Sequence, residues 1–223
     1  MSFSEVISSY YEDDIQKILD TTTDEDICRI LSKATLDKRD FLMLLSTAAS
    51  NHLEAMAEKS HMLTKQYFGN TMLIYTPMYI SNHCINRCIY CGFNITNKDL
   101  HRCKLTMDEI EQEAIFIAGT GMKHILLLTG ESPIDSPVEY IGNSAELLKK
   151  HFNSIGIEIY PLDINEYSNL ISKGVTGLTV YQETYNKKVY DTVHISGPKK
   201  NYKYRLDAPE RGCIAGMREV NIG

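Results

Sequence analysis

The sequence lacks the long apolar run and the long basic run that would indicate a membrane or a nucleic acid partner. No stretch approaches the roughly 20 apolar residues that a helix needs to cross a bilayer. The first seven residues also lack the basic and apolar regions of a secretory signal. A net charge of -6, with no basic run longer than a local pair, argues against nucleic acid as the main partner. We therefore expect a cytoplasmic protein that acts on a small molecule.

The cysteines are too unevenly spaced to predict a disulfide framework. Of the six, Cys28 and Cys213 stand alone and the other four fall within twenty residues. A domain of this size also has enough apolar sequence to build a core without disulfides. We interpret Cys28, Cys103 and Cys213 as free core or surface thiols.

Cys84, Cys88 and Cys91 form the pattern Cys-x3-Cys-x2-Cys, which most constrains the chemistry. Three thiolates in one loop can hold three irons of a [4Fe-4S] cluster and leave the fourth iron open to a small molecule. The alternative is a zinc site completed by His83 or His101. Structural zinc sites, however, prefer four ligands in paired Cys-x2-Cys spacing.

The first 70 residues are predicted to be helical, because apolar residues recur at three-to-four spacing. Thr23 and Asp37 resemble helix starts. From residue 72 the pattern changes to alternating strands and helices. Predicted strands cover residues 72–80, 124–129, 156–161, 175–181 and 217–223, and predicted helices begin at Thr106, Ser136, Asp163 and Asp207.

Alternating strands and helices with short connections predict a parallel α/β sheet with its functional groups at the C-terminal ends of the strands. Five strands are too few to close an eight-stranded barrel. We therefore expect a partial (β/α) TIM-like barrel over residues 71–223, preceded by a helical extension over residues 1–70. An incomplete parallel sheet leaves an exposed edge, so we expect the chain to be a fragment.

Polar residues follow several of these predicted strands. Thr129, Gly130 and Glu131 end the second strand, where the alternative is an ordinary polar turn. Glu158 and Tyr160 alternate along the third strand and are predicted to face the same side. A structural pair with a lysine or arginine is the alternative for Glu158. Gln182 and Glu183 after the fourth strand are further candidates. Arg205 is another, because its guanidinium is suited to bind a carboxylate. We predict that Lys199, Lys200 and Lys203 form a solvated basic loop.

The cysteine pattern, with Tyr90 before its last thiol, resembles the signature of the radical S-adenosylmethionine (SAM) superfamily. The resemblance implies a [4Fe-4S] cluster whose open iron binds the methionine part of SAM, and cleavage of SAM to a 5'-deoxyadenosyl radical. Residues 129–131 resemble the Gly-Gly-Glu element that receives the SAM amino group, with Thr129 in place of the first glycine. Glu158 is then predicted to contact the SAM ribose. The full set of predicted cofactor-binding residues is Tyr90, Thr129, Gly130, Glu131, Glu158, Tyr160, Gln182, Glu183 and Arg205, and the catalytic residues are not identified.

Segments 75–80, 90–94, 181–185 and 196–199 together resemble the aromatic-amino-acid lyases of this superfamily, in particular the tyrosine lyases of thiamine synthesis. That resemblance implies hydrogen abstraction from the amino group of L-tyrosine and Cα–Cβ scission to p-cresol and 2-iminoacetate. The implied partners are a reductase, flavodoxin or ferredoxin as electron donor, and thiazole synthase. Because the barrel of this family continues beyond residue 223 and its last strands help to close the cavity, we expect this chain alone to cleave tyrosine poorly.

Two alternatives remain open from the sequence. One is the related tyrosine lyase of hydrogenase maturation, which is distinguished by a second cluster on C-terminal cysteines. The other is a cluster or zinc module without catalytic activity that binds a partner.

Overall fold

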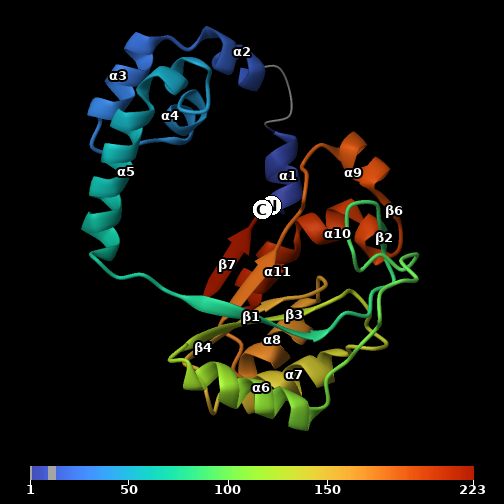
Figure 1. The fold of residues 1–223 in the computed structure, drawn as a ribbon. Coiled ribbons are helices and arrows are strands. Elements are labelled where there is room, and N and C mark those ends of the chain that lie inside the picture. Colours follow the sequence, from blue (N-terminus) through green and yellow to red (C-terminus); the bar gives the residue numbers. More distant parts are fainter. Residues whose placement is uncertain (1, 10–13) are drawn as a thin grey trace. The chain divides into compact units, whose positions relative to one another are not determined.

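The computed structural model describes residues 2–9 and 14–223, which divide into two compact units. One unit comprises Glu5–Met72, and the other comprises Leu73–Gly223 together with Ser2–Ser4. Figure 1 shows both units coloured along the sequence. No helix in the described part of the chain is long and apolar enough to span a membrane.

The first unit is helical, as predicted. Capping boxes at Thr23 and Asp37 begin α3 and α4, because each side chain accepts a hydrogen bond from the third backbone N–H of its helix. Ile27 and Ile30 of α3 are buried. The helices are α1 (Phe3–Ser8), α2 (Asp14–Thr21), α3 (Asp24–Ser32), α4 (Lys38–Met43), the 3-10 helix η1 (Ala48–His52) and α5 (Leu53–Phe68), with α1 shared between the two units.

The second unit is built on a five-stranded parallel sheet in the order β1-β3-β4-β5-β7, which confirms the predicted partial barrel. Consecutive strands of the sheet are neighbours, so their C-terminal ends lie along one edge (Figure 1). The strands are β1 (Tyr75–Ser81), β3 (His124–Thr129), β4 (Ser154–Glu158), β5 (Gly177–Val180) and β7 (Glu219–Ile222).

Helices α6 (Met107–Gly119), α7 (Val138–Leu148), α8 (Ile164–Ser172) and α11 (Ala208–Ala215) connect these strands and form the core with the sheet. Ile110, Leu148 and Leu170 from the helices are fully buried against strand residues such as Leu127 and Ile157. The capping boxes predicted at Thr106 and Asp163 are present. This layered core holds the strand ends, and therefore the site residues that follow them, in fixed positions.

Two predictions about local structure are wrong. Ser136 does not cap α7, because Pro137 occupies the N-cap in an extended conformation and the helix begins at Val138. Strand β4 ends at Glu158, so Tyr160 lies beyond it and does not alternate along a strand. The Tyr160 hydroxyl instead donates a hydrogen bond to the Ser136 carbonyl at 2.7 Å, which joins the ends of β4 and β3.

The sequence patterns also missed several short elements. Strand β2 (Arg87–Cys88), inside the cysteine loop, pairs with β6 (His194–Ser196) in an antiparallel arrangement. Strands of two or three residues are too short to show a periodic pattern. The segment predicted as a solvated basic loop includes η2 (Pro198–Lys200) and α10 (Tyr202–Leu206), and α9 (Lys187–Val193) precedes it.

Candidate functional site

A cavity of about 350 Å³ lies at the C-terminal ends of the strands and receives all three cysteines of the motif. The structure brings together almost every residue predicted from the sequence. Gln182 is the exception, because it is buried away from the cavity and its amide donates to the Tyr202 carbonyl at 3.3 Å. The predicted residues that line the cavity are Cys84, Cys88, Tyr90, Cys91, Thr129, Gly130, Glu131, Glu158, Tyr160, Glu183 and Arg205.

Backbone hydrogen bonds hold the cysteine loop against two other segments. The Ile85 N–H donates to the Glu131 carbonyl at 3.0 Å, which ties the loop to the end of β3. The Ile89 N–H donates to the Val193 carbonyl at 3.0 Å, next to the β2–β6 pair. The loop is therefore positioned before any cofactor binds.

Gly130 allows the close approach of β3 to the cysteine loop. A Cβ atom at this position would lie 2.3 Å from the carbonyl oxygen of His83 and 3.2 Å from the Cβ of Cys84. Carbon and oxygen atoms do not approach that closely without displacement of one chain. A glycine is therefore required between the Thr129 and Glu131 side chains that face the cavity.

The three thiols of the motif line the same cavity. Cys88 is buried, whereas Cys84 and Cys91 are partly exposed. Burial raises the pKa of the Cys88 thiol, the neighbouring Cys84 and Cys91 raise it further, and the Lys199 ammonium opposes that shift. In the described part of the chain, no three His, Cys, Asp or Glu side chains are grouped to hold one metal ion. Three thiols that line one cavity fit a cluster in which each thiolate binds a different iron, whereas a structural zinc ion needs four ligands.

Cys28, Cys103 and Cys213 are exposed free thiols, as predicted. None of them lines the cavity.

Tyr90 is anchored by a histidine that the sequence patterns did not identify. Its hydroxyl lies 2.7 Å from Nε2 of His194, whose Nδ1 lies 2.9 Å from the Tyr190 carbonyl. A carbonyl only accepts hydrogen bonds, so His194 donates from Nδ1. Its Nε2 therefore accepts the hydrogen bond that the Tyr90 hydroxyl donates. Burial lowers the pKa of His194, which favours this neutral form. The arrangement fixes the aromatic residue between the second and third cysteines.

Glu131 is held by Asn86 and Arg205. The Asn86 amide donates to Glu131 Oε2 at 2.7 Å, and Arg205 Nη1 lies 3.6 Å from the same oxygen. The two charged side chains are only 11% and 9% exposed. Burial raises the pKa of Glu131, although Arg205 and Asn86 oppose the shift. Asn86, which lies inside the cysteine loop, therefore couples that loop to the glutamate.

Two buried polar atoms on cavity-lining residues have no hydrogen-bond partner among the residues that the structure describes. They are Thr129 Oγ1 and Arg205 Nη1. Buried polar groups are rarely left unpaired unless a ligand or water satisfies them. Arg205 Nη1 lies within ion-pair distance of Glu131 but donates no hydrogen bond, so it could donate to a ligand that carries a carboxylate, as the methionine part of SAM does.

Glu158, Glu183 and Lys199 also line the cavity. Burial and the nearby Glu183 raise the pKa of Glu158, and no ion pair to Glu158 is present among the described residues. Lys199 was predicted to be solvated, but its side chain is only 12% exposed and its Nζ lies 2.6 Å from Glu183 Oε1. The prediction was wrong because the turn at Gly197 and Pro198 directs this segment toward the cysteine loop, where the Lys199 N–H donates to Asn86 Oδ1 at 2.9 Å. Lys200 and Lys203 are exposed, as predicted.

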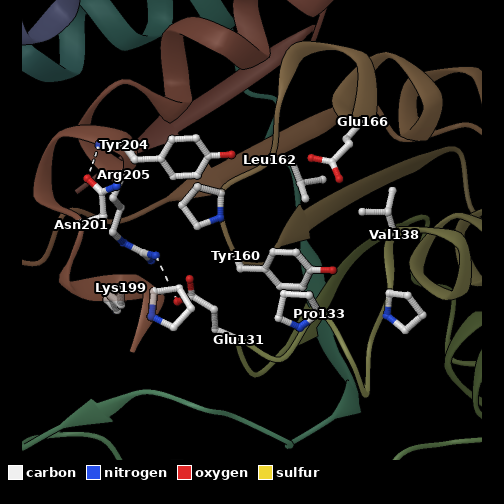
Figure 2. Close-up of a pocket in the computed structure, with 13 residues that line it drawn as sticks. Glu131, Pro133, Val138, Tyr160, Leu162, Glu166, Lys199, Asn201, Tyr204 and Arg205 are labelled. Carbon is white, nitrogen blue, oxygen red and sulfur yellow. Dashed lines mark hydrogen bonds and ion pairs between the residues drawn. The ribbon is translucent and has the colours of Figure 1, made fainter. Parts of the chain in front are cut away.

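A second cavity of about 470 Å³ adjoins the first (Figure 2). Figure 2 shows the Glu131–Arg205 ion pair at its border and Tyr160 and Tyr204 among its lining residues. Glu131, Tyr160, Lys199 and Arg205 line both cavities and form a wall between them.

The radical SAM superfamily model matches residues 78–223, which contain the whole site. The chain belongs to the radical SAM superfamily. Its cofactors are accordingly a [4Fe-4S] cluster and SAM. The three thiols that line the cavity fit the cluster, and the Arg205 and Thr129 atoms that lack a hydrogen bond fit SAM. The partial barrel of five parallel strands is the fold expected for a member of this superfamily.

The relatives of this chain include 2-iminoacetate synthases. It is 37% identical to the enzyme of Escherichia coli (strain K12) and 36% identical to that of Salmonella typhimurium, in both cases over 95% of this chain and 56% of the relative. Among solved structures it resembles HydG, a maturase of the [FeFe]-hydrogenase, with a TM-score of 0.88 and 27% identity over 94% of this chain and 49% of HydG. The chain thus spans about half the length of these relatives.

Sequence reasoning missed Asn86, His194 and Lys199. Asn86 and His194 act through side-chain contacts to segments that are distant in the sequence, so no local pattern marks them. Lys199 belongs to the segment 196–199 that resembles the lyases, and that resemblance was the available signal.

Proposed function

We propose that the protein cleaves L-tyrosine between Cα and Cβ to 2-iminoacetate and p-cresol, while SAM is converted to 5'-deoxyadenosine and methionine. The observation that carries this proposal is the 36–37% identity to 2-iminoacetate synthases over 95% of the chain. The product 2-iminoacetate would supply the thiazole part of thiamine through a thiazole synthase. A flavodoxin or ferredoxin is the proposed source of the electron.

The residues of the cavity have distinct proposed tasks. When bound, the cluster and SAM would supply the 5'-deoxyadenosyl radical that this reaction needs. Cys84, Cys88 and Cys91 would hold three irons of the cluster. Arg205 would receive the SAM carboxylate through Nη1, which donates no hydrogen bond in the structure, and Glu131 would receive the amino group.

Three further residues shape the surroundings of the radical. Glu158, which has no ion-pair partner among the described residues, lies at the end of β4 and accepts hydrogen bonds from the SAM ribose. Tyr90 is held in place by its bond to His194 Nε2 and closes one side of the cavity. Tyr160 lines another side of the cavity. Its hydroxyl is hydrogen-bonded to the Ser136 carbonyl and so adds no free polar group there. These rings form part of a lining that would shield a reactive intermediate from water once the cavity is closed.

The test is anaerobic reconstitution with iron and sulfide, followed by mass-spectrometric measurement of 5'-deoxyadenosine, p-cresol and glyoxylate, the hydrolysis product of 2-iminoacetate. We expect tyrosine to stimulate SAM cleavage and to yield p-cresol slowly, and we expect Cys88→Ser to abolish both. Phenylalanine should yield no cresol. A second arm uses a chimera in which the segment of the E. coli relative that follows the matched part is joined after Gly223. If that chimera cleaves SAM but yields no p-cresol from tyrosine, the proposal is wrong.

The similarity to HydG supports a second candidate, a lyase of hydrogenase maturation. Its identity to this chain is 27%, which is below the 36–37% of the 2-iminoacetate synthases. The DNA sequence downstream of the Gly223 codon separates the two, because C-terminal cysteines for a second cluster would indicate the lyase of hydrogenase maturation.

A further inference from the structure

Lys199 is a largely buried cation that lines the same cavity as the three cysteines. Its side chain is 12% exposed, and its Nζ lies 5.6 Å from the centre of the Tyr90 ring. Lysines are seldom buried to this extent unless they are paired. The partner is Glu183, whose Oε1 lies 2.6 Å away and whose side chain is one-third exposed.

The backbone places this ammonium group independently of its partner. The Lys199 N–H donates to Asn86 Oδ1, and the Lys199 carbonyl accepts a hydrogen bond from the Tyr190 hydroxyl. Gly197 precedes it with φ of +97°, and a Cβ at that glycine would lie 2.3 Å from Asn86 Oδ1. The turn is therefore packed directly on the cysteine loop, and removal of Glu183 would leave Lys199 beside the thiols.

Glu183 is held in an unusual backbone conformation. It is the one non-glycine residue with positive φ in the described part of the chain, at +72°. Side chains other than Asn, Asp or His rarely adopt this region, and such strain concentrates at functional sites. The conformation places a carboxylate next to Lys199 inside the same cavity.

A charge in this position acts on the electron affinity of a cluster bound by the thiolates. Reduction of the cluster adds one electron from a low-potential donor and forms or breaks no bond in the protein. The added negative charge is stabilised by a nearby cation and destabilised by a nearby carboxylate, and a partly buried site screens both effects only weakly.

We propose that Lys199 and Glu183 form an opposed charge pair that sets the reduction potential of the cluster, with Lys199 raising it and Glu183 lowering it. The pair would match the cluster to its electron donor while leaving the thiolate ligands unchanged. This inference rests on the cluster site of the proposed function but not on tyrosine as the substrate.

The test is a redox titration of the reconstituted protein, followed by electron paramagnetic resonance of the reduced cluster. We expect Lys199→Met to shift the midpoint potential to more negative values and Glu183→Gln to shift it to more positive values. The double variant should lie near the wild type, and Lys199→Arg should retain the wild-type potential. Lys200→Met is the matched control, because Lys200 is exposed and does not line the cavity.

Opposite shifts are the distinguishing result, because both single variants remove the same ion pair. If the pair had only a structural role, both variants would shift the potential in the same direction or not at all, and either outcome overturns the proposal. If Lys199→Met fails to bind iron, Glu183→Gln decides alone: a positive shift supports the proposal, and no shift or a negative one overturns it. Iron content and thermal unfolding confirm equal loading and folding. Failure of the chimera to form p-cresol would contradict the proposed function but leave these shifts measurable.

Discussion

Substitution of Gly130 by alanine tests whether the end of β3 must contact the cysteine loop as closely as the structure shows. The added Cβ would lie 2.3 Å from the His83 carbonyl oxygen. A normal carbon–oxygen contact is about 3.3 Å, so the two chains must separate by about 1 Å. Backbone hydrogen bonds oppose this movement on both sides, from Gly130 N–H to the Ser81 carbonyl at 2.9 Å and from Ile85 N–H to the Glu131 carbonyl at 3.0 Å.

The expected destabilisation of Gly130→Ala follows from these contacts. Overpacking of a rigid site costs about 1–3 kcal/mol, and each hydrogen bond weakened by the separation adds about 0.5–1.5 kcal/mol. For a chain of this size, each kcal/mol lowers the melting temperature by about 2–4 °C. Because the same contact positions Cys84, we also expect less iron to be bound after reconstitution.

The assay is thermal and denaturant unfolding of the apoprotein, with iron determination after reconstitution. Gly119→Ala is the matched control, because a Cβ at Gly119 meets nothing within 4 Å and the residue ends helix α6. We expect that variant to be unchanged or more stable by about 0.4–1 kcal/mol. The reasoning is refuted if Gly130→Ala unfolds within about 0.5 kcal/mol of the wild type and binds the same amount of iron.

Three further variants test the contacts around the cluster loop and the helical unit. Tyr90→Phe leaves Nε2 of buried His194 without its donor and should lower the unfolding free energy by about 1–3 kcal/mol, measured by denaturant titration. Asn86→Leu removes the donor to Glu131 and should weaken SAM binding by roughly 10- to 100-fold in equilibrium dialysis; unchanged binding would contradict that role. Asp40 has a pKa lowered by its lysine partner, so its stabilisation is present above the ordinary pKa of about 3.8 and is lost as the pH falls below it. The stability difference between wild type and Asp40→Asn should therefore shrink below pH 4, and a difference that grows there would contradict the assignment.

The strand order and most helix starts could be predicted from the sequence because they depend on local patterns. The apolar run at His124–Thr129 is a strand in the structure at the same residues, and Thr106 caps its helix as predicted. The cap of α7 was misplaced by one residue, because Pro137 is extended and excludes Ser136 from the N-cap. Periodicity thus located the elements but not every boundary.

The contacts between distant segments could not be predicted in the same way. Lys199 and Lys200 are adjacent and have the same side chain, so the sequence alone gives no reason to expect different exposure. In the structure Lys200 is exposed, whereas Lys199 is largely buried. Its burial depends on the antiparallel β2–β6 pair, which joins Cys88 to His194 across more than a hundred residues. Loop closure over such a distance leaves no signal in the local residue pattern.

The β2–β6 pair also changes the meaning of the segment from Tyr181 to Lys199. By its resemblance to the lyases this segment is a marker of tyrosine as the substrate. In the structure, however, His194 and Lys199 of this segment contact the cysteine loop, and Glu183 pairs with Lys199. These contacts therefore join the segment to the cysteine loop, and Lys199 and Glu183 are the pair proposed to set the cluster potential. The assignment of tyrosine rests instead on the similarity to 2-iminoacetate synthases along 95% of the chain.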